Sequence, residues 1–208
     1  MEFKVIDMDN WSRKETFEHF STVAKSTYSL TVKVDVTNLV EKIKKENLRF
    51  YPLFTWIVTK ALNQFEQFKM GYDAEGCLGY YSYINPMYSV MDQDKNVVSL
   101  CTEFEEEVST FYKKMSDDLD NFEKEGKETA FYPNFYIVSA LPWIHYESFT
   151  VLNESEQHFL FPMVTWGKYV KENDKYVIPL ALQVSHAVAD GYHCAQFYEA
   201  VEQLIQEV

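Results

Sequence analysis

Positive charge is scarce in this chain of 208 residues. It carries 19 lysines and arginines against 32 aspartates and glutamates, which gives a formal net charge of −13 at pH 7. Such an excess of carboxylates repels nucleic-acid backbones and anionic membrane surfaces. We therefore predict no nucleic-acid partner and no membrane partner. An anionic ligand would need a local cluster of Lys or Arg to overcome the overall field.

Cysteines are few, and long apolar runs are missing. The three cysteines, Cys77, Cys101 and Cys194, are an odd number without C-x-x-C spacing, which is typical of free thiols in a reducing compartment. The first residues, M-E-F-K-V-I-D-M-D, contain no apolar run that resembles a signal peptide. No stretch of about 18 apolar residues could span a bilayer. These features predict a cytoplasmic protein.

Glycine and proline are also sparse, with six of each scattered along the chain. No linker, low-complexity tract or internal repeat is visible. Apolar residues make up 47% of the chain and aromatic residues 17%, which is a globular composition with enough material for a sizeable core. We expect one domain that spans residues 1–208.

Hydrophobic periodicity predicts a mixture of helices and strands. Residues 28–36 alternate between apolar and polar side chains, as a half-buried strand does, and Thr37 is expected to cap the helix that follows to residue 46. Further helices are predicted at 13–25, 51–65, 105–127 and 192–208, and further strands at 78–84, 88–91, 97–104, 135–140, 146–151, 160–170 and 176–187, with a hairpin turn at 173–175. The predicted fold class is α/β in the broad sense (α+β), with helices packed on one mixed sheet.

Polar residues crowd into one short stretch near the carboxyl end, V-S-H-A-V-A-D-G-Y-H at 184–193. The apolar run before it predicts a buried strand that delivers His186 to the end of a sheet. Asp190 and Gly191 then open a helix, and the glycine is expected to give the backbone room to turn. A neutral imidazole in such a place can accept a proton near pH 7.

Other interpretations of this stretch stay open on the residues alone. His186 can be a structural histidine, and Asp190 can be a helix N-cap. A metal site formed by His186, Asp190 and His193 is disfavoured, because His-x-x-x-Asp-x-x-His is not a strong metal spacing. A Ser–His–Asp hydrolase would need a G-x-S-x-G elbow, whereas Ser148 lies in Y-E-S-F. The residues by themselves therefore predict a candidate general base and no more.

The longer string L-A-L-Q-V-S-H-A-V-A-D-G-Y-H at 180–193 contains an H-x-x-x-D-G motif and resembles the end of chloramphenicol acetyltransferases. The motif also occurs in dihydrolipoyl acyltransferase cores. Further segments resemble the acetyltransferase family in the family's order and cover nearly the whole chain: W-S-R-K-E-T-F (11–17), Y-S-L-T-V-K-V-D-V (28–36), R-F-Y-P (49–52), N-Q-F (63–65), S-A-L-P-W (139–143), E-S-F (147–149) and T-W-G-K-Y (165–169).

This resemblance implies a CoA-dependent acyltransferase fold and a homotrimer with active sites at the subunit interfaces. It implies direct acetyl transfer from acetyl-CoA to a substrate hydroxyl, without a metal. His186 matches the family's general base, and Ser148 matches the hydroxyl that binds the oxyanion. Thr165 matches a residue that acts through an ordered water. Asp190 matches a structural carboxylate that pairs with an arginine, here Arg13.

The resemblance also places the coenzyme. Arg49 and Lys168 match family positions that meet the phosphates of CoA, and Tyr51 and Tyr169 sit beside them. These cations would supply the local positive charge that the acidic chain lacks overall.

Differences from the family gather on the acceptor side. The predicted acceptor pocket contains Tyr28 and four substituted positions. Phe20 replaces a tyrosine and Ser26 a cysteine, while Val98 stands in place of a phenylalanine and His145 in place of an asparagine. Beside the proposed base, Ser185 stands where histidine is typical and Ala189 where cysteine is usual.

Three functional hypotheses follow. The leading one is a chloramphenicol O-acetyltransferase, which would inactivate the antibiotic. The alternative is an acyltransferase of the same fold with another hydroxyl or amine acceptor, as the substituted pocket suggests. A non-catalytic binding protein is disfavoured, because the five residues implied in catalysis and its support are all present.

Overall fold

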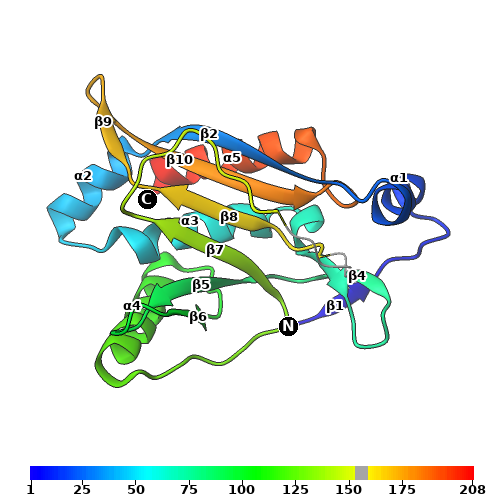
Figure 1. Ribbon diagram of the computed structural model, residues 1–208, viewed down its shortest axis with the longest axis horizontal. Coiled ribbons are helices and arrows are strands. Elements are labelled where there is room, and N and C mark those ends of the chain that lie inside the picture. The colour runs from blue at the N-terminus through cyan, green and yellow to red at the C-terminus, as the bar shows by residue number, and fades with distance from the viewer. Residues whose placement is uncertain (153–158) are drawn as a thin grey trace.

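The computed structural model describes residues 1–152 and 159–208 (Figure 1). The helices are α1 (Lys14–Glu18), which continues into the π-helix η1 (His19–Val23), α2 (Thr37–Glu46), α3 (Phe50–Asn63), the 3-10 helix η2 (Glu66–Lys69), α4 (Val108–Glu125) and α5 (Gly191–Glu207). The strands are β1 (Phe3–Val5), β2 (Thr27–Asp35), β3 (Met70–Tyr72), β4 (Leu78–Tyr81), β5 (Asn85–Met91), β6 (Val97–Cys101), β7 (Phe135–Leu141), β8 (Met163–Gly167), β9 (Val170–Glu172) and β10 (Lys175–Ser185).

In the described part of the chain, a seven-stranded sheet has the order β2-β10-β8-β7-β5-β6, and β9 pairs with β10. The β5–β7 and β7–β8 pairs are parallel and the other pairs are antiparallel, so the sheet is mixed, as predicted. A smaller sheet of the described residues, with the order β1-β4-β3, was not anticipated from the sequence. Strands β1 and β3 have only three residues each, too few for a pattern to be recognised.

The β2–β10 pair forms the longest ladder, from Val177 opposite Asp35 to Ser185 opposite Thr27. The alternating pattern of β2 and the apolar run of β10 predict this pair of strands. The hairpin between β9 and β10 turns at Asn173 and Asp174, whose φ angles are 46° and 68°. Two residues with positive φ are typical of the tight turns that join antiparallel strands.

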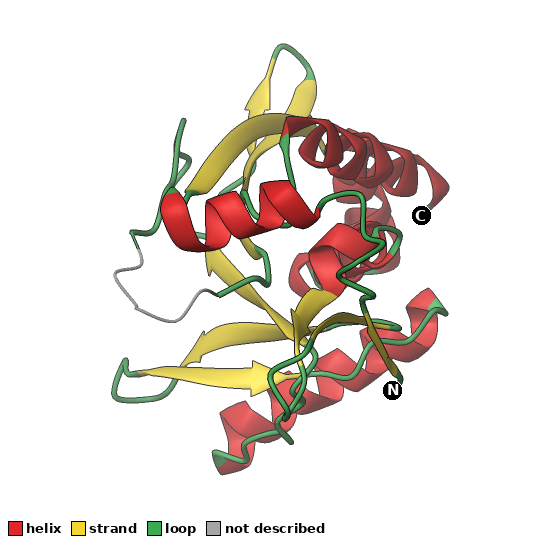
Figure 2. Cartoon of the chain, turned by 90° about the vertical axis from the view of Figure 1, so that its right-hand side faces the viewer, coloured by secondary structure: helices red, strands yellow, loops and turns green. Residues whose placement is uncertain are grey.

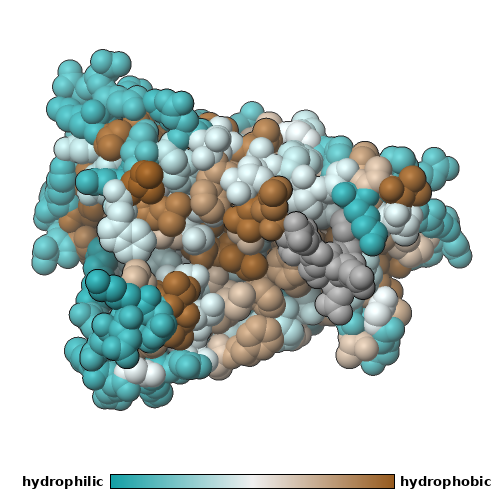
Figure 3. Space-filling view, viewed as in Figure 1, coloured by the Kyte–Doolittle hydropathy of each residue, from teal (hydrophilic) through white to brown (hydrophobic). Residues whose placement is uncertain are grey.

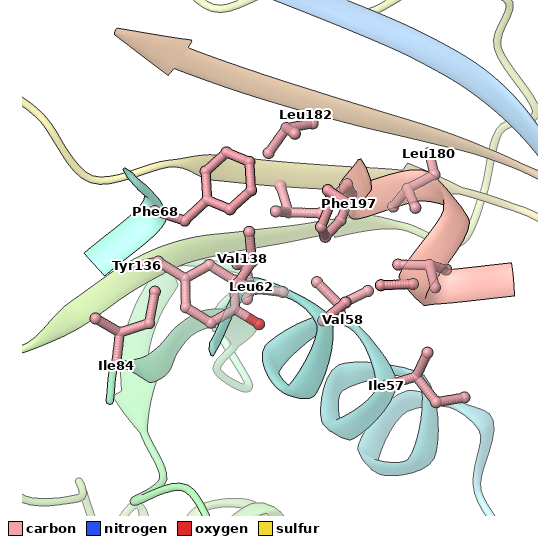
Figure 4. Packing of buried hydrophobic residues seen from close by; sticks show 14 of the residues in the cluster. Ile57, Val58, Leu62, Phe68, Ile84, Tyr136, Val138, Leu180, Leu182 and Phe197 are labelled. Atoms are coloured by element: carbon pink, nitrogen blue, oxygen red, sulfur yellow. The ribbon is translucent and has the colours of Figure 1, made fainter. Parts of the chain in front are cut away.

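The hydrophobic core lies between the large sheet and the helices α3 and α5 (Figures 1 and 4). Leu182 of β10 and Val138 of β7 point into it from the sheet, and Leu62 and Phe197 enter it from the two helices. All four side chains are fully buried. Burial of this kind is the main favourable term in folding, and it fixes the start of α5 next to the end of β10.

The opposite face of the large sheet is crossed by residues 142–152, which we call the crossing segment (Figures 1 and 2). The predicted strand at 146–151 is wrong, because this segment joins no ladder. Instead, Val151 exchanges two hydrogen bonds with the Gln183 side chain, at 2.9 and 3.0 Å, and the Ser29 hydroxyl donates to the Phe149 carbonyl at 2.8 Å. Strand β10 already pairs with β2 and β8, so no ladder position was free for the segment there.

Two local predictions need correction. The N-cap of α2 is Val36 rather than Thr37, and Asp35 accepts hydrogen bonds from the Thr37 backbone N–H and hydroxyl at 3.0 and 2.6 Å. Gly191 has no positive φ, and an added Cβ would meet nothing within 4 Å. The turn before α5 therefore does not need glycine for room. None of the helices in the described residues is long and apolar enough to cross a membrane.

Candidate active site

His186 stands immediately after β10, in a turn formed by residues 185–190 that we call the base turn. Its backbone N–H donates to the Ser26 carbonyl at 2.9 Å, which extends the β2–β10 pairing by one bond. The Ser185 carbonyl accepts from Val188 and Ala189 at 3.2 and 3.1 Å, and these bonds close the turn. The long ladder thus carries the imidazole to a fixed position at the end of the sheet.

One hydrogen bond decides which nitrogen of His186 can act as a base. Nδ1 lies 3.2 Å from the Ala189 carbonyl oxygen. A carbonyl can only accept, so Nδ1 carries the proton and Nε2 of the neutral ring has a free lone pair. The tautomer follows from this geometry, and it is the one that a general base at Nε2 requires.

Two aromatic rings hold the imidazole in place. The Phe20 ring stacks on it with centroids 4.0 Å apart, and the Tyr28 ring meets it edge-on at 5.1 Å. The Tyr28 hydroxyl lies 3.4 Å from the same Ala189 carbonyl. Burial raises the pKa of Tyr28 far above its usual value, so its hydroxyl stays a neutral donor. The structure therefore brings Phe20, Ser26 and Tyr28 together around His186.

Asp190 joins the base turn to the amino-terminal part of the chain. Its Oδ2 lies 2.8 Å from Arg13 Nη1, the pair that the resemblance implies. Its backbone nitrogen and Oδ1 lie 3.2 and 2.8 Å from Nδ1 of His193, which sits three positions into the helix, where a capping-box partner sits. The spacing Asp-x-x-His could have indicated this role for His193. Nε and Nη2 of Arg13 are buried and find no acceptor within the described residues.

The charges around Asp190 favour its ionised form. Partial burial alone would raise the pKa of this carboxyl, but the hydrogen bond from Arg13 and the charges of His193 and Arg13 outweigh burial, so the pKa lies below its usual value. A depressed pKa in the folded state means that the carboxylate stabilises the fold at neutral pH. This contribution is lost as the pH falls through the folded-state pKa.

We expect Asp190→Asn to lower the free energy of unfolding at pH 7 by about 1–2 kcal/mol. Breaking a fully buried ion pair costs about 3–5 kcal/mol. The side chains of Arg13 and Asp190 are 20% and 36% exposed, so screening by water reduces that figure here. Asparagine keeps the N-cap preference and removes only the charge. Urea unfolding at one protein concentration measures the difference, which should shrink as the pH falls below the usual pKa of an aspartate toward the lowered folded-state pKa.

Asp174→Asn is the matched control. Asp174 pairs with Lys171 at 3.2 Å, but its side chain is 97% exposed, and asparagine tolerates its positive φ. This variant should unfold like the parent protein. Equal losses in the two variants would show that Asp190 acts as an ordinary surface charge.

Ser148 and Thr165 lie on the sheet face that carries the crossing segment. Ser148 is exposed on that segment, between the hydrogen-bonded residues Tyr146 and Phe149. Thr165 is buried in β8, and its carbonyl accepts from the Tyr146 hydroxyl at 2.7 Å. Its cross-strand partner is Ala181. The crossing segment therefore places Ser148 on the face of the sheet that Thr165 shares.

His186 lies farther along the sheet. His186 follows Ala181 by five positions, which corresponds to roughly 16 Å of strand. Among the described residues, the hydrogen bonds and ring contacts of His186 come from residues 20, 26, 28 and 189, and not from the crossing segment. Within one chain, the structure thus separates the proposed base from Ser148 and Thr165.

Three of the four expected coenzyme residues line one cavity of about 440 Å³: Tyr51, Lys168 and Tyr169. We call it the coenzyme cavity. Its lining includes the rings of Phe50, Trp143 and Trp166 beside the two tyrosines, and Lys168 is the lining residue that carries a positive charge. A coenzyme with an apolar arm and anionic phosphates suits such a lining, because the rings shield the arm and the ammonium group attracts the phosphates.

Arg49 lies in an adjoining cavity of about 780 Å³, which shares Val90, Met91 and Leu119 with the coenzyme cavity. Its guanidinium pairs with Asp120 of α4 at 2.6 Å. Val98 of β6 lines this second cavity. Strand β6 is at the opposite edge of the sheet from β2, so Val98 does not join the residues around His186.

His145 also lies apart from His186. Its ring contacts Lys168 and Glu172 near the coenzyme cavity. Neither substituted residue beside the base disturbs the base turn. Ser185 Oγ accepts from the Ala187 N–H at 3.3 Å, and Ala189 is fully buried. In the described residues, no group of three or more His, Cys, Asp or Glu side chains is arranged to hold a metal ion.

Solved structures of similar fold show which class of protein fold the chain has. A structure of a chloramphenicol acetyltransferase matches 98% of the chain and 100% of its own length with a TM-score of 0.88, at 22% identity. A probable dihydrolipoamide acetyltransferase from Listeria monocytogenes matches 95% of the chain and 92% of its own length with a TM-score of 0.70, at 17% identity. The chain has the acetyltransferase fold of these two structures.

Sequence comparison then identifies the family. The family model described as chloramphenicol acetyltransferase matches residues 1–202. A chloramphenicol acetyltransferase of Clostridium butyricum is 34% identical over 211 residues, which cover 98% of this chain and 95% of the relative. The chain belongs to the chloramphenicol acetyltransferase family, a family of enzymes.

Proposed function

We propose that this chain transfers the acetyl group of acetyl-CoA to a hydroxyl group of chloramphenicol, which inactivates the antibiotic. Membership of the family supports the reaction. The observation that carries the mechanism is the contact between His186 Nδ1 and the Ala189 carbonyl at 3.2 Å, which leaves Nε2 free to accept a proton.

His186 would act first as a base and then as an acid. Nε2 removes the acceptor's hydroxyl proton while the oxygen attacks the thioester carbon, and a tetrahedral oxyanion forms. The Ser148 hydroxyl donates to this oxyanion, an interaction typically worth about 3 kcal/mol of the barrier. Collapse of the intermediate breaks the carbon–sulfur bond, and the imidazolium returns its proton to the leaving thiolate. Thr165 would assist through an ordered water.

The coenzyme would lie in the coenzyme cavity, with Tyr51 and Tyr169 against its arm and Lys168 near its phosphates. Arg49 would reach another phosphate from the adjoining cavity. Its present partner Asp120 would then be exchanged for the phosphate, so both anions compete for one guanidinium. No metal takes part in this mechanism.

We further propose a homotrimer in which each active site uses residues of two copies. The roughly 16 Å of strand between the Thr165 row and His186 supports this arrangement, because one tetrahedral intermediate cannot contact groups so far apart within a single chain. The face of the molecule that carries the crossing segment also has hydrophobic side chains over its middle, whereas hydrophilic residues gather over α4 and the β9–β10 hairpin (Figure 3). A second copy would cover such a surface.

Phe20, Ser26 and Tyr28 would form the acceptor pocket next to the base. We propose Val98 and His145 as pocket residues only if another copy brings them there, since in one chain they lie elsewhere. The stacked Phe20 ring lacks the hydroxyl of the tyrosine that it replaces. This difference favours the alternative function, in which the acceptor is another hydroxyl or an amine. We also propose that residues 1–208 form one acyltransferase domain and that the protein is cytoplasmic.

An assay of thiol release separates these functions. With acetyl-CoA and chloramphenicol we expect turnover of roughly 1 to 10³ per second. Reactions without acceptor give the background rate of hydrolysis. Release with another alcohol or an amine, but none with chloramphenicol, would favour the alternative. Tight binding of CoA with no transfer to any acceptor would indicate a non-catalytic binding protein.

A further inference from the structure

Three consecutive residues of the crossing segment bind the end of β8 and the residues after it. The Ile144 carbonyl accepts from the Lys168 backbone N–H at 2.7 Å. The His145 ring meets the Lys168 carbonyl, with Nδ1 3.0 Å from the oxygen. The Tyr146 hydroxyl donates to the Thr165 carbonyl at 2.7 Å. Both backbone polar groups of Lys168 are therefore bound by two adjacent residues.

The two pieces of chain are in direct contact at Gly167. A Cβ at this position would lie 2.7 Å from the Ile144 carbonyl oxygen and 3.0 Å from Cδ1 of Tyr146. Such distances are shorter than van der Waals contact, so only glycine permits the approach. A displacement of residues 144–146 would consequently move the Lys168 backbone as well.

His145 makes the side-chain contribution to this contact. Because a carbonyl only accepts, its Nδ1 is the donor to Lys168. Its Nε2 lies 3.8 Å from Glu172 of β9, and Lys33 of β2 holds the Glu172 carboxylate at 2.9 and 3.0 Å. The ring is 22% exposed. Only Nδ1 is held by a hydrogen bond, because the 3.8 Å between Nε2 and Glu172 is too long for one.

Two groups of the proposed reaction lie on either side of this histidine. Lys168 lines the coenzyme cavity. Ser148 follows His145 by three residues, and beyond Ser148 the chain is held again where Phe149 and Val151 bind Ser29 and Gln183. The position of Ser148 therefore depends on anchors at both of its ends, of which His145 belongs to the first.

We propose that His145 is a positioning residue that couples the coenzyme cavity at Lys168 to the segment carrying Ser148. It touches no reacting atom. Its work is to hold the Lys168 backbone, and hence the wall of the coenzyme cavity, in register with the crossing segment. This role differs from the acceptor-pocket role that the sequence implies for His145, and it rests on the proposed function for the identity of the coenzyme and for the role of Ser148.

Three substitutions at this position separate the contacts. Asparagine places an amide N–H close to where Nδ1 stands, so His145→Asn can keep the bond to the Lys168 carbonyl. Glutamine places its amide near Nε2, so His145→Gln loses the bond to the Lys168 carbonyl but keeps a polar group on the side toward Glu172. His145→Ala removes both. Circular dichroism and the melting temperature of each variant establish that it is folded.

For His145→Ala and His145→Gln we expect the Kd for CoA, measured by calorimetry, and the KM for acetyl-CoA to rise roughly 3- to 10-fold, the effect of one lost hydrogen bond. Because Ser148 shifts as well, kcat should fall several-fold, while the KM for chloramphenicol stays within about twofold. His145→Asn should remain within about twofold of the parent in every constant.

Several results would overturn this role. CoA affinity in His145→Ala equal to that of the parent would show that the ring positions nothing. If His145→Asn were as impaired as His145→Ala, the donor to Lys168 would be irrelevant. A change confined to the KM for chloramphenicol would return His145 to the acceptor pocket. Failure of the parent protein itself to bind CoA would instead refute the proposed function, and calorimetry distinguishes that case.

Discussion

His186→Ala is expected to lower kcat for acetyl transfer by roughly 10²- to 10⁴-fold, the usual contribution of a positioned general base. The geometry explains why no neighbour can substitute. The Ala189 carbonyl fixes the proton on Nδ1, and the Phe20 and Tyr28 rings fix the plane of the imidazole. Alanine removes the lone pair at Nε2 and leaves the hydrophobic surroundings in place. Steady-state kinetics with saturating acetyl-CoA measures the loss.

His19→Ala provides the matched control for this experiment. The His19 ring also packs against Phe20, with centroids 4.9 Å apart, but it has no part in the proposed chemistry. Its removal should leave kcat within about twofold. If His186→Ala turned over like the parent protein, the assignment of the base would be wrong.

Ser148→Ala is expected to lower kcat by roughly 10²- to 10³-fold with little change in KM, because an oxyanion donor acts mainly in the transition state. Ser148 is exposed and stands on a segment held at both ends, so alanine should not disturb the fold. Thr150→Ala removes another exposed hydroxyl from the same segment and should keep kcat within about twofold. Equal rates in the two variants would contradict the role of Ser148.

A mixture of the two inactive variants tests how the site is assembled. If each site takes His186 from one copy and Ser148 from another, mixed oligomers of His186→Ala and Ser148→Ala chains contain some sites with both residues intact. Activity should then recover well above the sum of the separate variants after joint refolding. No recovery, or a light-scattering mass near that of one 24.6 kDa chain, would place the site within a single copy.

The fold could be predicted from the sequence where patterns are long. The alternation of β2, the apolar run of β10 and the amphipathic α5 each extend over nine residues or more, so their periodicity is unambiguous. The crossing segment could not be predicted, because Tyr146–Val151 has the composition of a strand. What excludes a ladder there is the presence of β2 and β8 on both sides of β10, which is a property of the whole sheet.

The candidate site, too, could be predicted from the sequence only in part. Motif and resemblance together indicated His186, the Arg13–Asp190 pair and three residues that share a cavity. They could not reveal that the Ala189 carbonyl selects the imidazole tautomer, because every residue has a carbonyl and only the turn brings this one within 3.2 Å. Nor could they show that His145 faces Lys168, since that contact depends on how a loop without regular structure crosses the sheet.

The Gln183 side chain has a wider consequence. Its primary amide offers Val151 one acceptor and one donor, the same pair that a neighbouring peptide group would offer. Strand β10 therefore binds its neighbours β2 and β8 through backbone hydrogen bonds, and it binds the crossing segment through the Gln183 side chain. The crossing segment can vary in sequence without any change of register between β2 and β10. A substitution at Ser148, the proposed oxyanion donor, can therefore leave the proposed base His186 where the β2–β10 ladder holds it.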